Sequence, residues 1–277
     1  MIKNTGLSDH LFEKYSELVY QECGINLHQG KRTLLQARLN KRLRATRISD
    51  YESYYRFLTS PNNSEELVQF LDCISTNLTY FFREVQHLQL LDRLLPELLA
   101  GKKSRRDNRL RIWSAGCSTG EEPYSLVMCT LPHLDEFPEC DFRVLATDIS
   151  TRTLSIAARG IYAKEKIEKV PAPLRNRYFK QSSSDNGVRE YEVAPILRQI
   201  VSFRRLNLKD PYPFKGPFDY IFCRNVMIYF DKSTQEGLVN KMAGYLNEGG
   251  CLFVGHSESL MGLKHPLKYV CPAVYRK

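Results

Sequence analysis

The chain has 277 residues, enough for one large α/β domain and a smaller partner domain. Hydrophobic residues make up 43% of it, an ordinary share for a soluble globular protein with a packed core. The N-terminus has no apolar signal region, and no run approaches the roughly 20 apolar residues that a membrane span needs. These features exclude an integral membrane protein, and we expect a cytoplasmic location without membrane insertion.

Eight cysteines would suffice for a disulfide framework, but none forms a CxxC pair and several lie in apolar runs that resemble strands. This usage indicates buried free thiols in a reducing compartment. Cys223 is accordingly interpreted as a strand thiol and not as a nucleophile. No His/Cys spacing resembles a zinc site, so we expect no metal.

The net charge of +9 is distributed unevenly, because residues 31–47 contain seven basic residues and no acid. A stripe this dense suits a polyanionic partner such as nucleic acid, an anionic membrane or an acidic protein surface. It also suits a solvated helix face, and charge alone leaves these alternatives open.

Residues 8–72 have the pattern of helices. Ser8 or Asp9 can cap the first one, whose apolar positions recur at helical spacing. A Gly-Ile-Asn break at 24–26 precedes the basic stretch, which carries an apolar stripe of leucines. Two amphipathic segments, 51–58 and 65–72, follow. We predict a small all-α domain over residues 1–75.

Residues 76–109 are expected to form a linker and a connecting helix over 85–99, with a charged surface turn at 101–108. Short apolar runs then alternate with helical patterns, which predicts a parallel sheet covered on both faces. The runs are Leu110–Ala115, Phe142–Thr147, Val201–Leu206, Tyr220–Arg224 and Cys251–His256. The fold class is therefore α/β, a doubly wound Rossmann-like domain over 110–277 that ends in an antiparallel strand or hairpin at 268–276.

One segment, at about 177–200, departs from the α/β rhythm. A polar turn containing Asn186-Gly187 is flanked by alternating apolar residues, a strong hairpin signal. We predict a small antiparallel β subdomain there.

The loop after the first predicted strand favours a particular ligand. Gly116 and Gly120 admit close approach of a ligand to the backbone, but the spacing is GxxxG and not the GxGxxG of dinucleotide sites. Glu121 and Glu122 follow at once at a helix N-terminus, where they would repel a pyrophosphate. They suit a ligand with an ammonium group, and S-adenosylmethionine carries both an ammonium and a sulfonium.

The second strand ends at Asp148, where a carboxylate can accept hydrogen bonds from both ribose hydroxyls. The alternative is that Asp148 caps the helix expected at 151–159. Together with the glycine loop, the ribose interpretation is favoured.

A later strand runs into Arg224-Asn225-Val226-Met227-Ile228-Tyr229. Enzymes that methylate exocyclic amines of bases typically have an Asp/Asn-Pro-Pro-aromatic motif at this place. Its absence argues against a nucleobase N-methyltransferase despite the basic charge.

Five ordered segments resemble the CheR family of chemotaxis receptor glutamate O-methyltransferases, over a span from about residue 8 to the C-terminus. They are TNLTYFFRE at 76–84, WSAGCSTGEEPY at 113–124, ATDI at 146–149, FCRNVMIYFD at 222–231 and GHSES at 255–259. The resemblance implies methyl transfer from S-adenosylmethionine to receptor glutamates, which leaves S-adenosylhomocysteine and glutamate methyl esters in chemotactic adaptation.

The resemblance also implies site residues. The implied cofactor contacts are Asn77, Thr79, Arg83, Gly116, Glu122, Asp148, Asn207, Leu208, Arg224 and Asn225. Within this set, Glu122 would contact the methionine end, Asp148 the ribose, and Asn207 with Leu208 the adenine. Arg83 and Tyr229 are the implied catalytic residues. We assign both to orientation, since a glutamate carboxylate is already ionised at pH 7 and needs no general base. His256 is left outside the catalytic set.

The implied partner is the cytoplasmic part of methyl-accepting chemotaxis receptors. We expect it to dock on the basic helix at 31–47, with a receptor C-terminal tail as a possible ligand of the β subdomain and a regulatory protein as a possible further partner. The chain is expected to be a monomer that binds no nucleic acid. Two alternatives are kept: an RNA methyltransferase, suggested by the basic stripe, and a noncatalytic cofactor-binding regulator.

Overall fold

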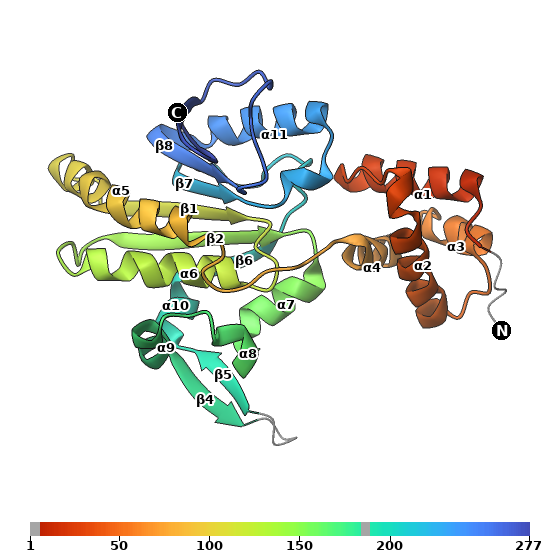
Figure 1. The fold of residues 1–277 in the computed structure, drawn as a ribbon, viewed down its shortest axis with the longest axis horizontal. Coiled ribbons are helices and arrows are strands. Elements are labelled where there is room, and N and C mark those ends of the chain that lie inside the picture. The colour runs from red at the N-terminus through yellow and green to blue at the C-terminus, as the bar shows by residue number, and fades with distance from the viewer. Residues whose placement is uncertain (1–5, 184–188) are drawn as a thin grey trace.

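A computed structural model describes residues 6–183 and 189–277, and the predicted Asn186-Gly187 turn lies outside these ranges. An all-helical N-terminal part stands beside a larger α/β part (Figure 1). The helical part consists of α1 (Asp9–Cys23), the 3-10 turn η1 (Gln29–Lys31), α2 (Arg32–Thr46), α3 (Tyr51–Leu58) and α4 (Ser64–Ile74).

Capping and burial explain the first two helices. The Ser8 hydroxyl accepts the N–H of Leu11 at 3.3 Å, as expected of an N-cap, and Gly24 ends α1 with a φ of 77°. The predicted leucine stripe of α2 is buried at Leu35, Leu39 and Leu43 in a core shared with α1, α3 and α4. The all-α fold of this part is thereby confirmed.

The α/β part is built on a seven-stranded sheet of order β6-β2-β1-β7-β8-β10-β9. Five strands are parallel: β1 (Arg109–Ala115), β2 (Asp141–Asp148), β6 (Val201–Arg205), β7 (Phe218–Cys223) and β8 (Leu246–Val254). The last two, β9 (Lys268–Cys271) and β10 (Val274–Arg276), form an antiparallel hairpin on the β8 edge. The predicted doubly wound fold and terminal hairpin are both confirmed.

Helices cover both faces of this sheet. Ile112 packs in one core with α5 (Val85–Ser104) and α6 (Glu121–Thr130), whereas its neighbour Trp113 packs in another core with α11 (Lys232–Gly244). The alternation follows from the pleat, which sends successive side chains to opposite faces. The other elements outside the β subdomain are η2 (Leu131–Leu134), α7 (Thr151–Arg159) and η3 (Met227–Tyr229).

The strand order creates a switch point between β1 and β7. From β1 the chain winds outward through β2 to β6, and then crosses back to place β7 on the other side of β1. Ligands of open α/β sheets bind beyond the carboxyl ends of the strands at such a point.

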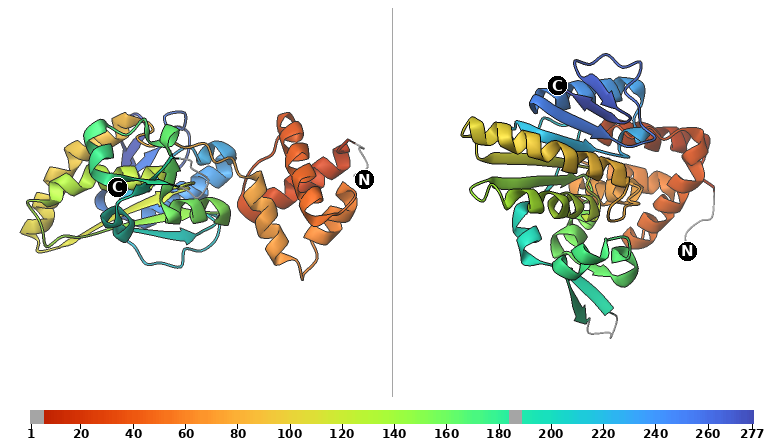
Figure 2. Two further views of the ribbon diagram at one scale, coloured as in Figure 1. Left: turned by 90° about the horizontal axis from the view of Figure 1, so that it is seen from below. Right: turned by 60° about the vertical axis from the view of Figure 1, so that its left-hand side comes forward.

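A second, three-stranded antiparallel sheet of order β3-β5-β4 projects from the main body, at the bottom of Figure 1 and again in Figure 2. It contains β3 (Ile161–Ala163), β4 (Phe179–Ser183) and β5 (Arg189–Val193), and the short helices α8 (Lys164–Ile167), α9 (Ala172–Tyr178) and α10 (Pro195–Ile200) adjoin it. The predicted antiparallel insertion is present, and β3 adds a strand ahead of residues 177–200.

The prediction of a surface turn at 101–108 is wrong for residues 101–104, because α5 continues to Ser104. Lys102 is only 2% exposed, and its Nζ lies 2.9 Å from carboxylate oxygens of both Asp107 and Asp219. A lysine paired with two carboxylates can be buried, and composition alone did not indicate the pairing.

All eight cysteines are free, as predicted, and burial raises the pKa of the Cys223 thiol well above its usual value. A protonated thiol is a poor nucleophile, which agrees with its interpretation as a strand residue. Within residues 6–183 and 189–277, no helix has the length and apolar character to cross a membrane.

Several hydrogen bonds attach the helical part to the α/β part. Asp72 of α4 accepts the backbone N–H groups of Thr151 and Arg152, at 3.0 and 3.3 Å, at the start of α7. On the other side, Asn207 donates from its amide to the carbonyl of Glu22 at 2.7 Å. The helical part is therefore fixed over the carboxyl ends of the strands.

Candidate cofactor and methyl-transfer site

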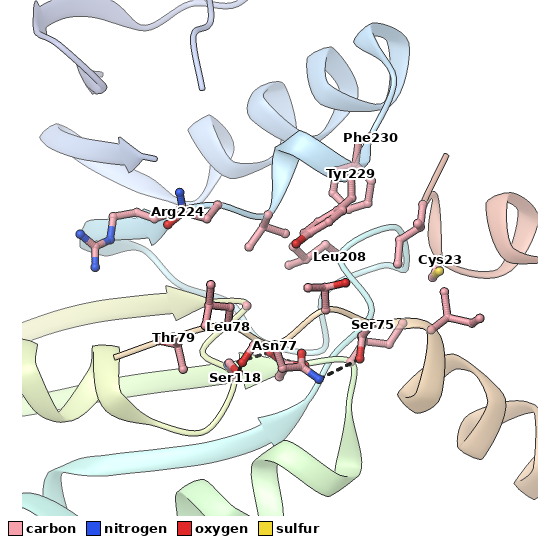
Figure 3. A pocket seen from close by; sticks show the side chains of 18 of the residues that line it. Cys23, Ser75, Asn77, Leu78, Thr79, Ser118, Leu208, Arg224, Tyr229 and Phe230 are labelled. Carbon is pink, nitrogen blue, oxygen red and sulfur yellow. Dashed lines mark hydrogen bonds between the residues drawn. The ribbon is translucent and has the colours of Figure 1, made fainter. Parts of the chain in front are cut away.

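A single cavity at the carboxyl ends of β1, β2 and β7 brings together every residue predicted for the site (Figure 3). Its lining includes Asn77, Thr79, Arg83, Gly116, Glu122, Asp148, Asn207, Leu208, Arg224, Asn225 and Tyr229. The cavity lies at the switch point of the sheet, and its opposite wall comes from the helical part. The roles assigned to these residues remain predictions.

Gly116 lies where the turn after β1 approaches the segment after β7. Its φ is 80°, and a Cβ at this position would lie 2.4 Å from Cγ2 of Val226. Its N–H donates to the carbonyl of Thr147 at 2.7 Å. Only glycine satisfies both the left-handed backbone and the close contact, and the glycine brings the two loops together at the cavity.

Asp148 is held at the end of β2 by two backbone donors. Its Oδ2 accepts the N–H of Ser118 at 2.8 Å, and its Oδ1 accepts the N–H of Ser150 at 2.9 Å. The helix cap of α7 is Ser150, so the alternative role of Asp148 as that cap is wrong. Burial raises the pKa of Asp148 above its usual value, although these hydrogen bonds oppose the shift. Each carboxylate oxygen keeps a lone pair for a further donor.

The acids that follow the glycine loop have different surroundings. Glu122 lines the cavity, and its Oε2 accepts from Nε of Arg224 at 2.7 Å while its Oε1 accepts from the Ser114 hydroxyl at 2.6 Å. Glu121 is fully buried outside the cavity lining and pairs with Lys166 at 3.1 Å. The argument for an ammonium ligand thus applies to Glu122 alone.

Glu84 is a further carboxylate beside Arg224, outside the cavity lining. Burial would raise its pKa, but a hydrogen bond with His87 and the charge of Arg224 outweigh burial and lower the pKa to about 2. In the described part of the chain, Glu84, His87 and His256 are the one group whose spacing could suit a metal ion. Nη1 of Arg224 already lies 3.3 Å from Nδ1 of His87 and 3.6 Å from Oε2 of Glu84. The positively charged guanidinium of Arg224 therefore lies beside the side-chain atoms that would bind a metal ion.

Tyr229 and Arg83 reach the cavity from different elements. Tyr229 lies on η3, beyond β7, and its side chain points into the cavity in Figure 3. Arg83, in the segment before α5, donates from Nη1 to the carbonyl of Leu78 at 2.7 Å, and its own carbonyl accepts from Nη1 of Arg224 at 2.8 Å. Both predicted catalytic side chains therefore border the same space.

The sequence interpretation missed the contribution of the helical part, which it assigned to docking alone. Residues from this part that line the cavity are Cys23, Ile25, Asn26, Leu27, Lys31, Leu34, Ile74 and Ser75. The N–H of Asn26 donates to the carbonyl of Tyr229 at 2.8 Å. No local pattern reveals a contact between residues so far apart in the sequence.

The lining suits a nucleoside that carries an amino-acid group. Asp148 offers oxygen acceptors for ribose hydroxyls, and Ile149 and Leu208 supply apolar surface beside it for a base. Glu122 and Arg224 present a carboxylate and a guanidinium that match the ammonium and carboxylate of an amino acid.

A doubly wound sheet with this cavity at its switch point defines a nucleoside-binding α/β protein. The model of the CheR methyltransferase S-adenosylmethionine-binding domain matches residues 77–274, and the model of the CheR all-alpha domain matches residues 10–75. The chain belongs to the CheR methyltransferase family and is an S-adenosylmethionine-dependent methyltransferase.

Individual relatives are similar over nearly the full chain. The chemotaxis protein methyltransferase of Borreliella burgdorferi is 39% identical over 278 residues, which cover 99% of this chain and 96% of the relative. The chemotaxis protein methyltransferase of Escherichia coli is 39% identical over 95% of this chain and 89% of its own. A probable chemotaxis protein methyltransferase of Rhizobium etli is 38% identical, with 94% and 96% covered.

Proposed function

We propose that this chain methylates glutamate side chains on the cytoplasmic part of chemotaxis receptors, which gives glutamate methyl esters. The observation that carries the proposal is the single cavity in which Glu122, Asp148 and Tyr229 come together beneath the helical part. The names of the full-length relatives supply the link to chemotaxis.

The chemistry explains why no nucleophilic side chain is needed. S-adenosylmethionine supplies a sulfonium methyl group; the glutamate oxygen forms a bond to this methyl as the carbon–sulfur bond breaks, and the electron pair stays on sulfur. A carboxylate and a sulfonium become a neutral ester and a thioether, so charge diminishes along the reaction. A cavity drier than water favours such a step, and near-attack positioning can contribute as much as ~7–11 kcal/mol.

The residues of the chain orient the reactants in this proposal. Asp148 would bind the ribose, Glu122 and Arg224 the amino-acid end, and Tyr229 would position the acceptor carboxylate near the methyl group. Arg83 would guide the acceptor into the cavity. A tight grip by Arg83 would stabilise the substrate carboxylate more than the transition state, in which its charge is shrinking.

The basic face of α2 is the proposed docking surface for acidic receptor helices. We define it as Lys41, Arg44 and Arg47, whose side chains are exposed. Lys31, which precedes α2, and Leu34 in its first turn line the cavity, so the helix that carries this face begins at the proposed site of transfer. Arg42 is excluded, since Nε and Nη2 hold both carboxylate oxygens of Glu66 at 2.9 and 2.7 Å.

Incubation of the purified chain with methyl-labelled cofactor and receptor-containing membranes tests the proposal. The expected product is labelled receptor that loses its label as methanol in mild alkali. Label that resists alkali, or that is transferred to RNA and not to protein, contradicts it. Cofactor binding without transfer to any receptor would favour a noncatalytic regulator instead.

A further inference from the structure

A buried carboxylate that does not line the cavity is hydrogen-bonded to a segment that does. Glu258 is 8% exposed and follows β8, in the GHSES segment that no predicted role uses. Its Oε2 accepts the backbone N–H of Asn225 at 2.8 Å and also that of Gly255, and its Oε1 accepts the N–H of Ile228 at 3.1 Å. Within the described residues it forms no ion pair. Its partners are backbone donors; Asn225 lies between β7 and η3, and Ile228 lies in η3 itself.

The neighbouring glycine makes this contact possible. A Cβ on Gly255 would lie 2.5 Å from Nδ2 of Asn225 and 2.8 Å from both the Asn225 nitrogen and Oε2 of Glu258. β7 and β8 are adjacent parallel strands, with Cys223 opposite Val254, so the two segments leave the sheet side by side. The absence of a side chain at Gly255 leaves room for Asn225, and the Glu258 carboxylate holds Asn225 there by a hydrogen bond.

The segment that Glu258 holds, residues 225–228, contains or adjoins several residues that line the cavity. Asn225 has a φ of 59°, a left-handed conformation that asparagine adopts more readily than most non-glycine residues. Its side-chain amide donates to Oε1 of Glu84 at 3.2 Å. Arg224 precedes it and pairs with Glu122, and Tyr229 ends the segment at the cavity.

We propose that Glu258 is a positioning residue for methyl transfer, which fixes the backbone of residues 225–228 and thereby directs Tyr229 and Asn225 toward the cofactor and the acceptor. This rests on the proposed function for the role of Tyr229. Glu258 itself touches neither reactant. Its carboxylate satisfies N–H groups that would otherwise leave the segment free to adopt other conformations.

The variant Glu258→Gln tests the proposal, since its amide NH2 would face backbone N–H donors. We expect kcat on receptor fragments to fall at least about tenfold, with the KM for the receptor changed less than about twofold. Glu248→Gln, on the preceding strand β8, is the control, since its carboxylate is 87% exposed, and it should match the wild type. In a Tyr229→Phe background, Glu258→Gln should reduce kcat by a much smaller factor than it does alone, because both changes act through one segment. Independent, multiplicative effects contradict the proposal.

Two measurements need no receptor and so separate this proposal from the proposed function. Calorimetry with S-adenosylhomocysteine should show weaker binding by Glu258→Gln. Hydrogen exchange should show lost protection at Asn225 and Ile228, while the amides of β7 and β8 stay protected. Unchanged exchange and binding, or protection lost across the whole sheet, overturn the positioning role whatever the acceptor proves to be. If Glu258→Gln does not fold, the shorter carboxylate of Glu258→Asp should give the same local pattern, and global unfolding of both variants also overturns it.

Discussion

Arg224 donates from Nε to Oε2 of Glu122 at 2.7 Å, which joins the end of β7 to the first turn of α6 across the switch point of the sheet. Arg224 is only 6% exposed, so its charge depends on Glu122 and Glu84 for compensation. The pair both stabilises the fold and shapes one end of the cavity.

The variant Glu122→Gln should therefore lose cofactor affinity and stability together. Removal of one partner from a buried ion pair typically costs about 3–5 kcal/mol, and Glu84 should reduce that cost here because it remains beside the guanidinium. We expect S-adenosylhomocysteine to bind at least about tenfold more weakly by calorimetry. Glu139→Gln, at an exposed position, is the control. Wild-type affinity in Glu122→Gln would exclude this pair from the cofactor site.

Glu84 should make the protein sensitive to acid over a defined range. Its pKa is about 2 in the folded protein and near 4.5 when unperturbed. A lowered pKa adds stability that is fully present above pH 4.5 and is lost as the pH falls toward 2, here up to about 3 kcal/mol. Urea unfolding at a series of pH values should show a shallower loss in Glu84→Gln over this range. Parallel curves for wild type and variant would show that Glu84 contributes no such linkage.

The contact between Gly116 and Val226 predicts a suppressor. Gly116→Ala would place a Cβ 2.4 Å from Val226 in a left-handed conformation, so we expect cofactor binding to be lost or reduced more than about tenfold. Val226→Ala removes the atom that clashes, and the double variant should regain part of the affinity. Since the backbone conformation still disfavours alanine, the recovery should be incomplete. A double variant as weak as Gly116→Ala would show that strain alone is responsible.

The basic face of α2 should affect the receptor and not the cofactor. Lys41→Glu with Arg44→Glu is expected to raise the KM for receptor fragments about tenfold or more at low salt, with a smaller effect at high salt. Binding of S-adenosylhomocysteine should stay within about twofold. By contrast, Arg42→Glu should lower the melting temperature, because it places a like charge against Glu66. An unchanged KM in the double variant would place docking elsewhere.

Periodicity and loop chemistry predicted the sheet and its helices, because these elements depend on residues that are close together in the sequence. Ile112-Trp113 in β1 and Tyr220-Ile221-Phe222 in β7 are local apolar runs, and the Ser8 cap is a local signal. The surface turn expected at 101–108 was wrong in its first half, where the burial of Lys102 depends on Asp219, more than a hundred residues away.

The candidate site divides in the same way. Gly116 follows β1, Glu122 lies in the first turn of the next helix and Asp148 ends β2, so strand order is enough to bring them together. The contacts of Asn26 with Tyr229, and of Glu258 with Asn225, depend on how separate segments pack. The sequence offered GHSES only as part of a resemblance, without a role for its glutamate.

Glutamate methylation can be tested directly by tandem mass spectrometry, which maps the modified atoms of a purified receptor cytoplasmic fragment after incubation with this chain and S-adenosylmethionine. We expect one added methyl group on particular glutamates, removed by mild alkali and absent when those glutamates are replaced by alanine. Methyl groups found on lysine, arginine or cysteine, or on no residue of any receptor while the cofactor is bound, would contradict it.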